Sequence, residues 1–135
     1  GSGAAGGLGF GLMTFLKAHL QSGIETVLDI VDFDNVIKDC DLVISGEGRI
    51  DHQSMYGKVP TGVAKRAKKQ GIETVCIVGS IGNSVGDIYD CITTIESCVD
   101  HCCDINEALE NAKDNVYKAS FRLARSIQLG QKMRF

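Results

Sequence analysis

Two short, β-branched, apolar runs lie on either side of one well-marked helical segment, and this order constrains the fold most. The runs are 41–45 (DLVIS) and 74–78 (TVCIV), and each suits a strand that is buried in a parallel sheet. Between them, Pro60 fits the first turn of a helix near 58–70, which ends in a cationic turn and Gly71. A strand, a helix and a second strand predict a parallel crossover.

The rest of the chain extends the same rhythm. Strands are expected near 41–46, 74–79 and 91–95, and helices near 8–22, 58–70 and 105–129. A capping box at 104–107 begins the last helix, whose apolar stripe runs to Ile127. Shorter helical turns are expected after Ile24 and around an Asp34 cap, although the first of these also fits a strand. The chain therefore reads as one α/β unit, residues 1–135, with a parallel Rossmann-like or flavodoxin-like sheet flanked by helices.

Composition excludes several classes of protein. The 135 residues are 44% hydrophobic and 23% charged, which is typical of a globular domain and not of a disordered chain. The net charge is −3 with scattered Lys and Arg, so no nucleic-acid partner is expected. The apolar runs are far shorter than the roughly 20 residues that cross a bilayer, so no membrane partner is expected either. Without a visible signal peptide, the six cysteines are expected to be reduced thiols in the cytoplasm and unnecessary for folding.

Chemistry is expected in the glycine-rich loop 46–58, because ligands of parallel sheets bind beyond the carboxyl ends of the strands. This loop carries two acids, Glu47 and Asp51, and two cations, Arg49 and Lys58, with His52 beside Asp51. Acids can orient a hydroxyl or Mg²⁺, and cations can neutralise phosphate. The alternative is structural: Arg49 pairs with Glu47 or Asp51 and only braces the turn.

A second glycine cluster, 1–7 (GSGAAGG), leads directly into the first predicted helix. It satisfies the dinucleotide pattern G-x-G-x-x-G, but no strand precedes it and no acid ends a second strand at the required distance. An anion-binding helix N-terminus needs only backbone N–H groups and the helix dipole, so this is the favoured interpretation. Gly57-Lys58 is not a P-loop, because Val59 stands where Ser or Thr is required.

The thiols and imidazole of Cys98, His101, Cys102 and Cys103 are the ligand types that zinc prefers. Their spacing fits no zinc pattern, so ordinary surface thiols are the favoured interpretation. Cys76 and Cys91 are expected to be small core residues inside strands. The basic residues from Lys65 to Lys69 are expected to form a solvated helix face.

Three stretches of the sequence match a known family pattern. GSGAAGGLGFGL, DLVISGEGRIDHQSMYGKVPTGVAKRAK and IVGSIG resemble, in this order, the C-terminal segment of the type I glycerate kinases, the bacterial glycerate 2-kinases. The resemblance implies a fragment of a two-domain α/β kinase nearly three times as long, with its active site in the interdomain cleft. It implies transfer of the ATP γ-phosphoryl group to a hydroxyl of glycerate, with 2-phosphoglycerate as the product. The cysteine cluster is not part of the family pattern.

Roles for single residues follow from what phosphoryl transfer requires, namely positioning and charge neutralisation. Asp51 is expected to act as the base or the Mg²⁺ anchor, Glu47 as a second carboxylate, and Arg49 and Lys58 as clamps on phosphate or carboxylate. The backbone at Gly3, Ala4, Gly6 and Gly7 is expected to cradle phosphate. ATP, glycerate and the missing N-terminal part of the chain are the expected partners, and self-association stays open. The competing hypothesis is a non-catalytic anion- or nucleotide-binding module, followed by a redox or zinc module.

Overall fold

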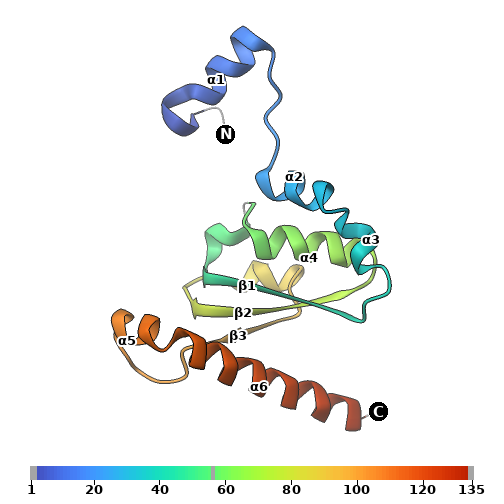
Figure 1. The fold of residues 1–135 in the computed structure, drawn as a ribbon, viewed down its shortest axis with the longest axis vertical. Helices are drawn as coiled ribbons and strands as arrows, with labels where there is room; N and C mark the ends of the chain where they lie inside the picture. Colours follow the sequence, from blue (N-terminus) through green and yellow to red (C-terminus); the bar gives the residue numbers. More distant parts are fainter. Residues whose placement is uncertain (1–2, 56, 134–135) are drawn as a thin grey trace.

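The computed structural model describes residues 3–55 and 57–133. They form three layers, with a parallel sheet between α4 and its neighbouring helices on one side and α6 on the other (Figure 1). The elements, in chain order, are α1 Ala4–Leu16, α2 Gly23–Ile30, α3 Phe33–Ile37, β1 Leu42–Ile50, η1 His52–Met55, α4 Val59–Lys69, β2 Glu73–Ile81, η2 Gly86–Asp90, β3 Thr94–Ser97, α5 Ile105–Glu110 and α6 Ala112–Lys132. No described helix is long and apolar enough to cross a membrane.

The sheet is parallel and its strand order is β1-β2-β3. Leu42 of β1 stands opposite Glu73 of β2, and Val75 of β2 stands opposite Thr94 of β3. The α/β class, the parallel pairing and the helix at 58–70 are therefore confirmed. Pro60 lies in the first turn of α4, as its missing N–H and fixed φ favour.

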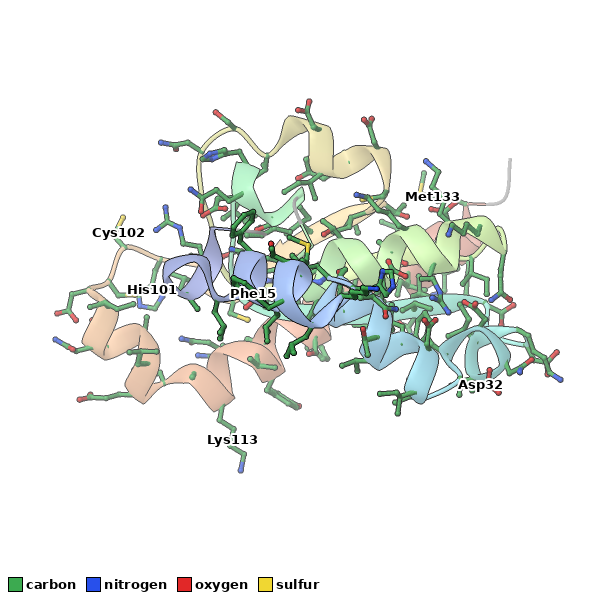
Figure 2. All side chains as sticks on the ribbon, turned by 90° about the horizontal axis from the view of Figure 1, so that it is seen from above. Phe15, Asp32, His101, Cys102, Lys113 and Met133 are labelled. Atoms are coloured by element: carbon green, nitrogen blue, oxygen red, sulfur yellow. The ribbon has the colours of Figure 1, made fainter. Side chains whose placement is uncertain are left out.

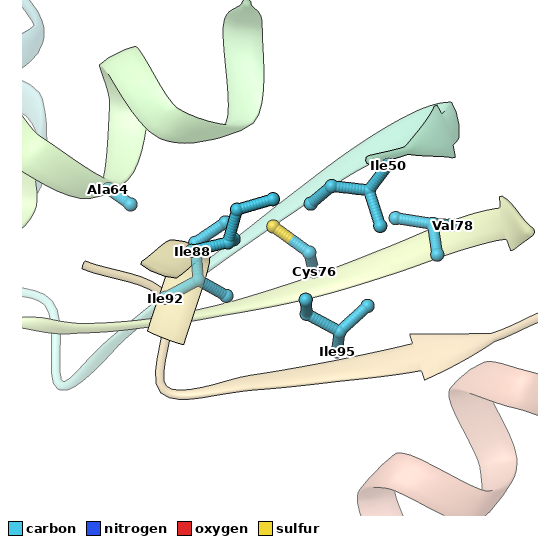
Figure 3. Packing of buried hydrophobic residues seen from close by; sticks show 7 residues of the cluster. All are labelled: Ile50, Ala64, Cys76, Val78, Ile88, Ile92 and Ile95. Atoms are coloured by element: carbon cyan, nitrogen blue, oxygen red, sulfur yellow. The ribbon is translucent and has the colours of Figure 1, made fainter. Parts of the chain in front are cut away.

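The core lies between the sheet and the layer of α4 and η2 (Figure 3). It consists of Ile50, Ala64, Cys76, Val78, Ile88, Ile92 and Ile95. A second cluster joins α2 and α3 to α4 and to the start of the sheet through Leu28, Ile37, Val43, Val63, Ala67 and Ile72. The carboxyl half of the sheet is thus held on its α4 face, which fixes the loop that follows β1.

The first strand is longer than the sequence indicates. It continues through Gly46-Glu47-Gly48 to Ile50, so the predicted loop 46–58 begins only after Ile50. β1 and β2 approach each other closely near their carboxyl ends, and only glycines leave enough space for this approach. A Cβ on Gly79 of β2 would lie 2.4 Å from the carbonyl oxygen of Gly48. The glycines there serve close strand packing, whereas the sequence analysis read them as a turn.

The third strand lies further along the chain than predicted, at Thr94–Ser97 and not at 91–95. Cys91 and Ile92 belong to the turn after η2, where the N–H of Ile92 donates to the carbonyl of Ile88 over 2.9 Å. Ile92 is fully buried in this turn. Residue 92 is apolar because it is buried in the turn, so the apolar run at 91–95 begins before the strand does. Cys91 is therefore not a strand residue.

The first helix ends at Leu16, and the predicted helix to residue 22 is wrong. Lys17 adopts φ +53°, a left-handed conformation that ends the helix, and its N–H bonds the carbonyl of Leu12. Residues 17–22 then lead to α2. In Figure 1, α1 (blue) stands away from the three layers at the end of this connection.

The predicted C-terminal helix is divided at Asn111 into α5 and α6. The predicted N-terminal cap is confirmed, because the Asp104 carboxylate accepts from the N–H groups of Asn106 and Glu107 at 2.8 and 3.0 Å. Only part of the predicted apolar stripe is covered. In α6 the buried residues are Asn115, Ala119 and Leu123, while Ile105 and Leu109 of α5 remain exposed.

Candidate active site

Asp51 lies at the carboxyl end of β1, where the strand turns into η1. Its Oδ1 atom accepts the N–H of Gln53 over 3.0 Å, and its own N–H donates to the hydroxyl oxygen of Ser54 over 3.1 Å. Its side chain is 24% exposed, so the carboxylate is held in place and still reaches solvent. This position suits a group that acts on a bound ligand.

Two of the predicted cations face this carboxylate. Arg49 Nε lies 3.9 Å from Asp51 Oδ2, and Lys58 Nζ lies 3.8 Å from Asp51 Oδ1. Both distances are longer than a direct charged hydrogen bond, and Arg49 is largely exposed. The Arg49–Asp51 pair matches the structural alternative. However, long, exposed ion pairs contribute little stability, so bracing alone is a weak role for these charges.

The turn is braced instead by buried hydroxyl groups that the sequence analysis did not single out. The Thr61 hydroxyl donates to the carbonyl of Ser54 over 2.6 Å, and the carbonyl of Lys58 lies 3.1 Å from the same oxygen. Ser54 and Thr61 are both almost fully buried. Their contacts tie η1 to the first turn of α4, and so they set the distance between Asp51 and Lys58.

Gly82, the residue that follows β2, lies beside the end of β1. The N–H of Gly82 donates to the carbonyl of Ile50 over 2.7 Å. A Cβ at Gly82 would stand 3.0 Å from the Asp51 Cβ and 3.2 Å from Arg49 Nη2. The absence of a side chain at residue 82 therefore keeps the space around the Asp51 carboxylate open.

Glu47 is not joined to the other candidate side chains. Its Oε1 accepts the N–H of the adjacent Gly48 over 3.0 Å, and within the described ranges no hydrogen bond or ion pair links it to Asp51, Arg49 or Lys58. Each carboxylate keeps oxygen lone pairs that are not used in hydrogen bonds, and such oxygens can bind a hard cation such as Mg²⁺. Asp51 and Glu47 thus have the right donor chemistry for Mg²⁺, but no group of three or more metal-binding side chains occurs in the described part of the chain.

The N-terminal glycine cluster forms a left-handed turn ahead of the regular part of α1. Ala5, Gly6 and Gly7 have φ values of 52°, 66° and 88°, and Gly3 occupies the N-cap position. Gly1 lies outside the described residues. No hydrogen bond or ion pair links residues 3–16 to any other described element, so the structure does not bring this cluster to Asp51.

In the cysteine cluster, the imidazole of His101 is paired with carboxylates. His101 contacts two carboxylates, with Nδ1 2.9 Å from Asp100 and Nε2 3.5 Å from Glu107, and these neighbours raise the pKa of the imidazole. His101 and Cys102 lie in the loop before α5 (Figure 2). Cys98 is buried and all six cysteines are free thiols.

Arg66 differs most from expectation, since the sequence analysis placed it on a solvated helix face. Its guanidinium contacts Glu25 at 3.1 Å, Asp29 at 2.7 Å and Asp34 at 2.8 Å, and its side chain is only 14% exposed. Asp34 is therefore a partner of Arg66, and Asp32 occupies the N-cap position of α3. A signal existed in the sequence: acids four residues apart on one helix face, at 25 and 29, favour a cation opposite them.

The fold and the loop after β1 define an α/β segment with a carboxylate and two cations at the end of a parallel strand. The protein-family model described as the glycerate kinase family matches residues 1–128, and the chain belongs to this family.

Curated relatives share most of this chain. It is 42% identical over 134 residues to a glycerate kinase of Bacillus subtilis and 44% identical over 133 residues to a glycerate 2-kinase of Escherichia coli. Each match covers 98% of this chain and 35% of the relative, so the chain spans about a third of their length. A crystal structure of a glycerate kinase 2 assigned in Salmonella typhimurium LT2 superposes with a TM-score of 0.73 at 38% identity, over 98% of this chain and 34% of that one. The observed three-stranded arrangement thus matches one part of that larger structure.

Proposed function

We propose that this chain is the C-terminal segment of a two-domain, ATP-dependent glycerate kinase, in which it forms one α/β unit. The full protein would transfer the γ-phosphoryl group of ATP to a hydroxyl of glycerate, with 2-phosphoglycerate as the product. The observation that carries the proposal is the placement of Asp51 between Arg49 and Lys58 at the carboxyl end of β1, in a chain of this family. Such a reaction also fits the cytoplasmic location expected from the sequence.

The reaction assigns one task to each charged group. The glycerate hydroxyl oxygen forms a bond to the γ-phosphorus, the bond from that phosphorus to the β–γ bridging oxygen breaks, and ADP leaves. Asp51 accepts the hydroxyl proton as a general base, or anchors the metal. Arg49 and Lys58 hold the phosphate or the glycerate carboxylate, because both present cationic donors toward the same opening. The backbone at Gly3, Ala4, Gly6 and Gly7 is the proposed phosphate cradle.

Magnesium is the proposed cofactor, held by Asp51 and Glu47 with phosphate oxygens and water as the other ligands. When bound, Mg²⁺ neutralises charge that develops on the phosphates. We also propose that the 135 residues alone are inactive. A kinase must surround two substrates and exclude water, and Asp51 in this segment reaches solvent at the end of a single sheet.

A chimera tests the proposal in a full-length setting. In it, this chain replaces the 133 matched residues of the Escherichia coli enzyme, and ATP-dependent phosphorylation of glycerate is followed with a coupled assay. Asp51→Asn is expected to lower kcat on the order of 100-fold, because loss of a base or metal anchor removes transition-state stabilisation. Lys58→Ala is expected to raise KM for ATP or glycerate with a smaller effect on kcat.

The matched control is Asp41→Asn, the same substitution at the opposite, amino end of β1, where the residue is exposed. It is expected to keep kcat within twofold. Near-normal kcat in the Asp51→Asn chimera would remove Asp51 from the chemistry and would favour the structural alternative, in which Arg49 and Asp51 only brace the turn. ATP-dependent turnover by the isolated 135 residues, absent from their Asp51→Asn variant, would contradict the proposed inactivity of the segment.

A further inference from the structure

An apolar groove of about 510 Å³ opens on the face of the sheet opposite α4. Its floor includes Ile44, Ile77 and Gly79 of the two longer strands, and its wall includes Ile105, Leu109 and Val116 of α5 and α6. The apolar side chains that line it are unusually exposed: Ile44 is 57% exposed and Leu109 is 66% exposed. A contiguous apolar surface of this kind on a globular domain marks an interaction site.

The groove exists because α6 covers only one side of this sheet face. The buried residues of α6 begin at Asn115, and the helix contacts β2 and β3 but leaves β1 uncovered (Figure 1). In the sheet that the described residues form, β1 is also an edge strand, with β2 as its one neighbour. β1 is nine residues long, and its unpaired edge lies beside an open apolar face. Both features favour contact with further polypeptide.

Asn115 supplies a polar signal inside the groove. It is only 4% exposed and lines the groove, and its side-chain amide has no hydrogen-bond partner among the described residues. Among the described residues only Thr74 Oγ1 is a fully buried side-chain polar atom without a partner, so the Asn115 amide still reaches solvent in the open groove, and an occupant that covers it must satisfy it. The occupant of the groove is therefore expected to present a backbone or side-chain polar group to Asn115.

The helix α1 is a second part of the chain with exposed apolar side chains. Its thirteen residues include no charged side chain, and its large apolar side chains point largely into solvent, with Phe15 83% exposed. It stands off the layers on the connection 17–22 (Figure 1), and none of its residues lines the groove. A short helix that has no charged side chain and exposes its apolar side chains is stable in water only when it packs against other protein.

We propose that the groove and α1 together form the docking surface for the additional polypeptide that full-length glycerate kinases possess. This inference rests on the proposal that the chain is a segment of a longer kinase. Relatives carry the same segment joined to about twice as much further chain, which is long enough to cover both features at once. The docked part is an apolar stretch against Ile44 and Leu109 that also satisfies Asn115.

Co-expression tests the docking surface separately from catalysis. Tagged residues 1–135 are produced together with the Escherichia coli glycerate 2-kinase polypeptide that lacks its 133 matched residues. Purification by the tag is expected to yield a 1:1 complex by light scattering. Leu109→Glu and Phe15→Glu are each expected to lower the yield of complex at least tenfold, because a carboxylate cannot be buried against apolar side chains without a partner.

Val36→Glu is the matched control, because Val36 is a helical residue with nearly the same exposure as Leu109 but lies on α3, away from the groove. It is expected to leave the yield unchanged. Melting temperatures of the isolated variants show that each still folds: all three side chains are exposed, so shifts within about 2 °C are expected. A complex that forms without glycerate phosphorylation would support docking and contradict the proposed function.

Three results would overturn the inference. The first is recovery of the tagged chain without the co-expressed polypeptide. The second is a dimer of the chain that Leu109→Glu dissociates, which would make a second copy the occupant. The third is a melting temperature that ATP or adenosine raises in the isolated chain but not in its Leu109→Glu variant, which would make the groove a nucleotide site.

Discussion

Arg66 Nη1 of α4 donates to Asp29 Oδ1 of α2 over 2.7 Å, and the same guanidinium contacts Asp34 of α3. One side chain therefore fastens two N-terminal helices to the helix that leads out of the candidate active site. Three carboxylates around one guanidinium form a network, which contributes more than isolated surface pairs do.

Arg66→Met is expected to lower the melting temperature by several degrees, because three acids then lose the guanidinium that joins them. Lys69→Met, in the exposed last turn of the same helix, is the control and is expected to change it by less than about 2 °C. Thermal unfolding followed by circular dichroism measures both. Equal shifts for the two variants would show that the cluster adds nothing specific.

The stabilisation from Arg66 is expected to depend on pH with a definite sign. Its hydrogen bond holds the pKa of Asp34 below the ordinary value of 3.8. A carboxyl group with a depressed pKa in the folded state stabilises the fold above its unfolded pKa, and loses this contribution as pH falls through the folded pKa. The difference between wild type and Arg66→Met is thus constant from about pH 5 to 7 and shrinks below about pH 4. Urea unfolding at a series of pH values measures it.

Gly79→Ala is expected to destabilise the chain by about 1–3 kcal/mol, because the new Cβ would meet the Gly48 carbonyl at 2.4 Å and the strands must part. Gly130→Ala is the opposite case. Gly130 lies inside α6, and a Cβ added there would have no atom within 4 Å, so alanine is expected to stabilise by about 0.5–1 kcal/mol. Chemical denaturation of both variants gives the two signs, and a stable Gly79→Ala chain would contradict the close approach.

Thr61→Val is expected to cost about 1–3 kcal/mol, since it leaves the buried carbonyl of Ser54 without its donor. Thr74→Val provides a control of equal size and burial. The Thr74 hydroxyl is buried in β2 without a hydrogen-bond partner among the described residues, so its replacement is expected to be neutral or stabilising. Urea unfolding compares the pair. A similar loss in both variants would show that the Thr61 contacts are not what holds the loop.

The thiols are expected to react in an order that follows burial. Burial raises the pKa of Cys76 to about 11, and the thiolate is the reactive form, whereas Cys40 and Cys102 are exposed. Iodoacetamide at about pH 8, followed by mass spectrometry, is expected to modify Cys40 and Cys102 first and Cys76 only after denaturant is added. Modification of Cys76 at the rate of Cys102 would contradict the packing of the core.

Local sequence patterns were sufficient to predict those elements whose structure depends on residues close together in the chain. The helix around Pro60 and the Asp104 cap depend on propensity and short-range hydrogen bonds, and the two longer strands appear as β-branched, apolar runs, so the sequence displays all of these directly. The sequence also placed Asp51 beyond the carboxyl end of this strand, but in a loop that was expected to begin at Gly46, whereas β1 continues to Ile50.

Contacts between distant residues could not be read in the same way. The Arg66 cluster joins residues more than 30 positions apart, and the glycines of β1 look like a turn until β2 lies beside them. The apolar stripe of α5 and α6 predicted burial, yet Leu109 is exposed because the described chain has nothing to cover it. Periodicity shows which face is apolar and does not show what lies against it.

The uncharged helix α1 has a consequence for the protein in a cell. Proteases and chaperones recognise apolar segments that a folded protein leaves accessible, and copies that expose them are removed or held. A chain with Phe15 in solvent would meet this surveillance until another polypeptide shields it. Its abundance would then follow the supply of that polypeptide, so that assembly sets the lifetime of the molecule.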